Sequence, residues 1–93
     1  MTIEVKLFAT LRMHLGVAAV SLEVDSPPTV DELIKMVSEE VGEDIHDWLL
    51  EEDESLRMGT MILLDGHNII HINGLATKVD TTQVAIFPPA GGG

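Results

Sequence analysis

The sequence contains no cysteine and few aromatic or basic residues. The absence of cysteine excludes disulfide bonds, zinc–thiolate sites and cysteine nucleophiles. Phe8, Trp48 and Phe87 are the only aromatic residues, so the core is predicted to be aliphatic. Five basic residues against sixteen acidic ones leave a formal net charge of −11. That balance argues against binding to nucleic acid or to an anionic membrane surface, because both require clustered Lys and Arg.

No apolar run approaches the roughly 20 residues that span a bilayer. Residues 1–6 alternate apolar and polar side chains and lack the apolar region of a signal peptide, so we expect a cytoplasmic protein. The 93 residues, 45% of them hydrophobic, are suited to one globular domain. The acidic charge fits either a basic partner or adaptation to high salt, and composition does not separate these two.

The first half of the chain predicts two strands followed by a long helix. Residues 2–8 and 20–24 alternate apolar and polar side chains, as half-buried strands do, and residues 9–15 have room for a short helix. A capping box of Thr29 and Glu32 marks the start of the long helix, and Gly42 suits its end. The apolar face of this helix consists of Val30, Leu33, Ile34, Val37 and Val41.

The second half predicts a short helix at 45–49, an acidic loop and three strands. The pair Asp65-Gly66 lies between apolar segments and predicts a hairpin turn that joins strands 60–64 and 67–72. The last strand covers 84–87. The prediction is therefore an α+β fold, in which one long helix crosses one face of a mixed sheet of about five strands.

No motif for catalysis or metal binding is present. His67 and His71 could both face one ion on a helix, but on the predicted strand they would lie about 13 Å apart, too far for one zinc. We therefore interpret them as exposed strand residues. Adjacent acids such as Glu39 and Glu40 are interpreted as solvent-facing charge, and the serines lack the context of a nucleophile elbow. We expect neither a catalytic residue nor a metal site.

The C-terminus is the distinctive chemical feature of the chain. Residues 1–89 are predicted to form the domain, and 90–93 a flexible glycine tail. Pro88 and Pro89 favour an extended exit from the last strand. Gly92 and Gly93 carry no side chains, so the free α-carboxylate could enter a narrow slot in another protein. An activating enzyme could convert this carboxylate into an electrophilic acyl adenylate.

Phe87 is a candidate contact for a partner. If Val84 and Ile86 face the core, alternation along the strand turns Phe87 to the opposite face, beside the tail. Aromatic residues are enriched at the centres of protein interfaces. The alternative is that Phe87 closes the bottom of the core.

Three segments resemble the MoaD/ThiS family of ubiquitin-like β-grasp sulfur carriers. They are LFATLR (7–12), ILLDG (62–66) and VAIFPPAGGG (84–93), of which only the Phe-Pro-Pro-x-x-Gly-Gly ending is individually specific. The family includes the small subunit of molybdopterin synthase and the small archaeal modifier proteins. Asp80 to Gln83 departs from the Asp-Gly-Asp turn that is common in the family, with little expected consequence for function.

The resemblance implies a carrier protein that is not itself an enzyme. A ubiquitin-activating-type enzyme would use ATP to adenylate Gly93, and sulfur delivery would give a thiocarboxylate. The sulfur would pass to a molybdopterin precursor on the larger synthase subunit. The carrier itself would bind no cofactor, while Phe87, Pro88 and Pro89 would contact partners.

Two alternatives remain open from the sequence. The first is a protein modifier, in which Gly93 becomes linked to lysines of target proteins. The second is a non-covalent β-grasp interaction module whose tail takes no part. The glycine ending argues against the second, because an idle terminus gains nothing from it.

Overall fold

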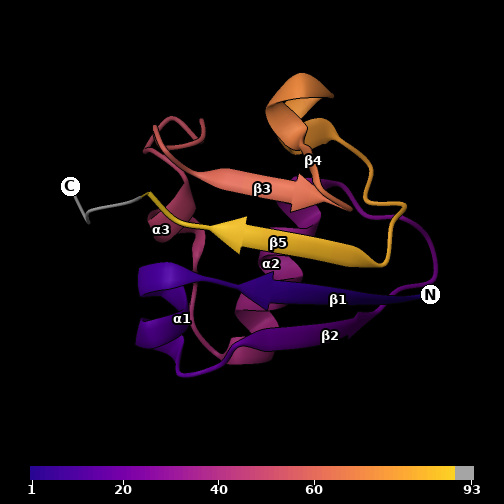
Figure 1. The fold of residues 1–93 in the computed structure, drawn as a ribbon, viewed down its shortest axis with the longest axis horizontal. Helices are drawn as coiled ribbons and strands as arrows, with labels where there is room; N and C mark the ends of the chain where they lie inside the picture. Colours follow the sequence, from indigo (N-terminus) through magenta and orange to yellow (C-terminus); the bar gives the residue numbers. More distant parts are fainter. Residues whose placement is uncertain (90–93) are drawn as a thin grey trace.

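The sheet has the strand order β2-β1-β5-β3-β4, with the first and last strands of the chain side by side near its middle (Figure 1). The computed structural model describes residues 1–89; the expected tail at 90–93 lies outside the described residues. The strands are β1 Thr2–Leu7, β2 Ala19–Glu23, β3 Met61–Leu64, β4 His67–Asn68 and β5 Gln83–Phe87. The helices are α1 Ala9–Leu15, α2 Val30–Val41 and α3 His46–Leu49, with 3-10 turns η1 Ile69–His71 and η2 Gly74–Ala76.

The pairing of the strands confirms the predicted mixed sheet. β1 pairs with β5 in parallel, with Leu7 beside Ile86, and all other neighbouring strands are antiparallel. β5 lies between β1 and β3, so its backbone is hydrogen-bonded on both sides. The last strand is therefore held firmly in the middle of the sheet up to the residue that precedes Pro88.

The hydrophobic core fills the space between the sheet and α2, which crosses behind the strands in Figure 1. Alternate residues of the strands and one face of α2 supply it, and the side chains of Ile3, Leu33 and Ile86 are fully buried. The core is aliphatic, as predicted: within residues 1–89 no aromatic side chain is fully buried. Within the same residues, no helix crosses the opposite face of the sheet (Figure 1).

Both predicted ends of α2 are confirmed. The Glu32 backbone N–H donates to the Thr29 hydroxyl (3.1 Å), and the Thr29 N–H donates to Glu32 Oε1 (2.8 Å). Gly42 adopts a left-handed conformation with φ 77°, and its N–H donates to the Ser38 carbonyl. These contacts satisfy backbone groups that a helix end otherwise leaves unpaired.

The Asp65-Gly66 hairpin is confirmed, but the return strand is shorter than predicted. Asp65 and Gly66 have φ of 50° and 86°, as a two-residue hairpin loop with both residues left-handed requires. β4 contains only two residues, and the segment expected to continue it to residue 72 forms η1 instead. Asn68 explains the difference: its side chain accepts a hydrogen bond from the Ile70 N–H, which closes a turn at an unpaired sheet edge.

Within residues 1–89, no helix has both the length and the apolar character needed to cross a membrane. The acidic segment that follows α3 is exposed, as predicted.

Candidate docking face and C-terminal exit

The last strand presents opposite faces to the core and to the solvent. Val84 and Ile86 are buried beneath α2, whereas Ala85 and Phe87 are half-buried on the face that the helix leaves open. Phe87 therefore faces away from the core, as alternation predicts, and the alternative that it closes the core is wrong. Its proposed role as a partner contact remains a prediction.

Phe87 is held in place by a second aromatic ring. Phe8 stacks on it with ring centroids 4.3 Å apart and an interplanar angle of 8°. Phe8 follows β1 and precedes α1, and its N–H donates to the Ile86 carbonyl (3.1 Å). Because β1 and β5 are parallel neighbours, the two phenylalanines meet at the same end of the sheet. The stacking fixes the orientation of Phe87 before any partner binds.

Further half-buried apolar side chains lie beside the stacked pair on the open face of the sheet. This set, here called the apolar strip, consists of Phe8, Met61, Leu63, Ala85 and Phe87.

The small Ala85 side chain leaves a hollow in the apolar strip. Lys6 of β1 and Leu63 of β3 lie directly across from Ala85. The resulting cavity of about 300 Å³ is bounded by Phe8 and Leu63 on its apolar side and by Lys6 and Asp65 on its polar side. The apolar strip can therefore accept a protruding apolar side chain from a partner, with charged groups at its margin.

Pro88 and Pro89 differ in their exposure. Pro88 is buried against the domain, whereas Pro89 is half-buried and keeps accessible surface. Of the three residues expected to contact partners, Phe87 and Pro89 thus present surface. Gly92 and Gly93, the residues expected to be activated, lie outside the described residues.

Sequence reasoning missed Phe8, Met61 and Leu63 as members of this surface. A signal for the two β3 residues was present, because residues 61–64 are apolar on both faces, which is typical of a strand covered on both sides. Two exposed methionines extend the same end of the molecule, Met13 of α1 and Met58 in the loop before β3, with exposed fractions of 81% and 95%.

The residues considered for metal or acid–base chemistry lie on the surface of the domain. His67 and His71 are exposed, but His71 lies in η1 rather than on the predicted strand. Within residues 1–89, no group of three or more potential ligands is placed to hold a metal ion. Glu39 and Glu40 are exposed, as predicted.

The perturbed carboxylates have local structural causes. Hydrogen bonds from Thr29 lower the pKa of Glu32, those from His46 lower the pKa of Asp44, and those from Ser55 lower the pKa of Asp53. Each donor belongs to the same cap or turn as the carboxylate, so these shifts stabilise local structure rather than prepare an acid or base.

A mixed sheet with the first and last strands parallel at its centre, crossed by one long helix, is the ubiquitin-like β-grasp fold. The chain belongs to the ThiS family, whose model matches residues 5–93. This family comprises small ubiquitin-like carrier and modifier proteins.

Two similar proteins align with this chain over its whole length. Small archaeal modifier protein 3 of Haloferax volcanii is 31% identical to it, and a protein of Archaeoglobus fulgidus, named as a candidate sulfur carrier protein, is 32% identical. Each alignment covers 100% of both chains. The crystal structure of the Amycolatopsis orientalis BexX/CysO complex contains a chain with 28% identity and a TM-score of 0.72, covering 98% of this chain and 99% of that one.

Proposed function

We propose that this protein is a sulfur carrier whose Gly93 carboxylate is adenylated, converted to a thiocarboxylate and used for molybdopterin synthesis. The observation that carries the proposal is the stacked Phe8–Phe87 pair on the apolar strip, next to the point where β5 ends. Six residues follow Phe87 and can extend up to about 20 Å. A partner bound to the apolar strip thus has the terminal carboxylate within reach.

The proposed chemistry takes place at the terminal carboxylate. A carboxylate oxygen attacks the α-phosphorus of ATP, pyrophosphate leaves, and an acyl adenylate forms. A hydrosulfide anion then attacks the acyl carbon, AMP leaves and one proton is released, which gives the thiocarboxylate. The activating enzyme supplies ATP and catalysis, and this chain supplies the acyl group and the binding surface. No cofactor of its own is required.

Two partners follow from this proposal. The first is an adenylating enzyme of the ubiquitin-activating type, and the second is the large catalytic subunit of molybdopterin synthase. Similarity to a chain in the BexX/CysO complex supports binding to a partner protein. The net charge of −11 favours association with basic surfaces on either partner.

A second function uses the same activated tail. In a protein modifier, a target lysine amine attacks the acyl adenylate, AMP leaves, and an isopeptide bond forms. The 31% identity to small archaeal modifier protein 3 favours this alternative. The two functions differ in the nucleophile that receives Gly93, sulfur in one and lysine nitrogen in the other.

The intact mass of the full chain tests both functions. The protein is incubated with a ubiquitin-activating-type enzyme, ATP and a sulfur donor, in the presence and absence of a lysine-containing target protein. For a carrier, we expect replacement of one terminal oxygen by sulfur. For a modifier, we expect a conjugate whose mass equals the sum of the two chains less one water.

Two variants control this experiment. Deletion of Gly92 and Gly93 should abolish both products while changing the thermal midpoint little, because the deleted residues follow the domain. Gly91→Ala preserves the terminal glycine pair and should be activated normally. Absence of both products with wild-type protein, when the enzyme is active on another carrier, would contradict both functions and leave a non-covalent binding module.

A further inference from the structure

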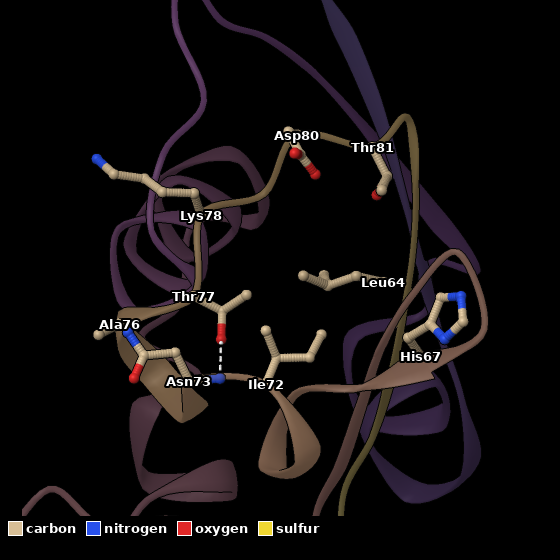
Figure 2. Close-up of a pocket in the computed structure, with 9 residues that line it drawn as sticks. All are labelled: Leu64, His67, Ile72, Asn73, Ala76, Thr77, Lys78, Asp80 and Thr81. Carbon is tan, nitrogen blue, oxygen red and sulfur yellow. Dashed lines mark hydrogen bonds between the residues drawn. The ribbon is translucent and has the colours of Figure 1, made fainter.

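A second cavity lies at the other end of the sheet from Phe87. Its volume is about 390 Å³, within the range of roughly 300–1,000 Å³ for ligand clefts. It opens where the segment after β4 meets the segment that leads into β5 (Figure 2). Its lining residues are Leu64, His67, Ile72, Asn73, Ala76, Thr77, Lys78, Asp80 and Thr81.

The interior of this cavity is apolar. Figure 2 shows the side chains of Leu64 and Ile72 pointing into it from two sides. Thr77 turns its methyl group inward, because its hydroxyl accepts a hydrogen bond from the Asn73 N–H (3.0 Å). Ile72 is 54% exposed, so part of this apolar side chain stays accessible at the rim.

The polar groups that point into the cavity are acceptors for a cation. The Asp80 carboxylate projects into the cavity from its upper edge in Figure 2, and the neighbouring Thr81 hydroxyl, which donates to the Gln83 carbonyl (3.3 Å), keeps lone pairs that can accept. Asp80 forms no ion pair among residues 1–89.

The lysine on the cavity wall does not neutralise Asp80. The Lys78 side chain points away from the cavity in Figure 2, and its charge contributes to the lowered pKa of Glu32 at the start of α2. The remaining titratable group on the rim is His67. An apolar interior with one uncompensated carboxylate at its edge is thus complementary to a side chain that has an aliphatic stem and a cationic end.

We propose that this cavity binds an arginine side chain presented by a basic partner protein. The aliphatic stem of arginine would lie against Leu64 and Ile72, and the guanidinium would donate to Asp80 and Thr81. A guanidinium suits this pair of acceptors better than an ammonium, because its donors are arranged in a rigid fork. The net charge of −11 favours approach of a basic protein.

The cavity lies apart from the stacked phenylalanines of the apolar strip. Asp80 and Thr81 precede β5, whereas Phe87 ends it, so the cavity and Phe87 lie at opposite ends of that strand (Figure 1). A protein bound at the cavity would leave Phe87 and Pro89 accessible. The proposal is thus independent of the chemistry at Gly93, and either can fail without the other.

Amide NMR spectra of the full chain, titrated with N-acetyl-L-arginine amide, test the proposal. We expect saturable shifts at Leu64, Ile72, Thr77 and Thr81, with a dissociation constant on the order of 1 mM for so small a probe. Asp80→Asn should weaken binding by at least about fivefold. Glu39→Gln removes the same charge from the exposed side of α2 and should leave the affinity nearly unchanged.

Two comparison probes separate charge from apolar contact. N-acetyl-L-norleucine amide has an aliphatic stem without a cation, and N-acetyl-L-lysine amide has a cation without the fork. Both should bind more weakly than the arginine probe. Equal binding of norleucine, equal binding to Asp80→Asn, or no saturable shift at the cavity amides would overturn the proposal.

Discussion

The two faces of the sheet are both rich in apolar residues, but only one of them is covered. On the face beneath α2, Val84 and Ile86 are buried in an aliphatic core. On the open face, their neighbours Ala85 and Phe87 are half-buried, and no helix within residues 1–89 crosses them. The covered face accounts for folding. The open face keeps apolar surface accessible after folding, which is what a binding surface requires.

The largest expected effect tests the covered face. Leu33→Ala and Ile86→Ala should each lower the free energy of unfolding by about 2–5 kcal/mol, because both side chains are fully buried. Chemical denaturation with a constant m-value would measure this loss. A near-neutral result at either position would contradict the assignment of that face as the core.

An intermediate effect is expected at Phe87, the residue that follows Ile86 in β5. Phe87→Ala should weaken binding to the activating enzyme by about tenfold or more while lowering stability by only about 1 kcal/mol, the loss of the stacking with Phe8. Binding by calorimetry and stability by denaturation are compared on one preparation.

Ile86→Ala is the matched control for Phe87→Ala, since it truncates the adjacent side chain on the opposite face. While folded, it should bind the enzyme nearly as wild type does. If Phe87→Ala lost more stability than Ile86→Ala and retained full affinity, the contrast between the two faces would be refuted.

The smallest effect concerns the capping box beside the covered face. Hydrogen bonds from Thr29 hold the pKa of Glu32 below the ordinary value of a glutamate, so the folded state favours the ionised form. The resulting stability is fully present above that value and is lost as the pH falls through the lowered pKa. The stability difference between wild type and Glu32→Ala should therefore shrink in acid.

Glu32→Gln controls for this effect, because glutamine retains an acceptor for the Thr29 N–H and does not titrate. The stability of Glu32→Gln relative to Glu32→Ala should stay constant as the pH is lowered. Thermal midpoints of the three proteins from neutral pH to pH about 3 provide the measurement. If the stability of wild type relative to Glu32→Ala increased in acid, the expected direction of this pH dependence would be wrong.

Local sequence signals predicted the parts of the fold that depend on neighbouring residues. The Thr29–Glu32 cap, the Asp65-Gly66 turn and the outward direction of Phe87 each follow from residues a few positions apart. Residues 69–72 were misassigned because their β-forming side chains were outweighed by one hydrogen bond that the Asn68 side chain accepts from the Ile70 N–H. Apolar composition alone does not predict such a turn.

The surfaces that depend on distant residues could not be predicted. The stacking of Phe8 on Phe87 requires β1 and β5 to lie in parallel, a pairing between opposite ends of the sequence. The cavity beside Asp80 requires three separate segments to meet. Alternation shows which way a side chain points, but not which side chain lies next to it.

The parallel pairing of β1 and β5 also has a mechanical consequence. Glu4 donates to Thr82 at one end of this ladder, and Phe8 donates to Ile86 at the other. The amino end of β1 and the carboxyl end of β5 lie at opposite ends of the paired strands (Figure 1). Tension between Met1 and Pro89 therefore loads the ladder in shear, so its hydrogen bonds must yield together rather than one after another. A partner that pulls on the C-terminus while the amino end is held therefore loads all the hydrogen bonds of this ladder at once.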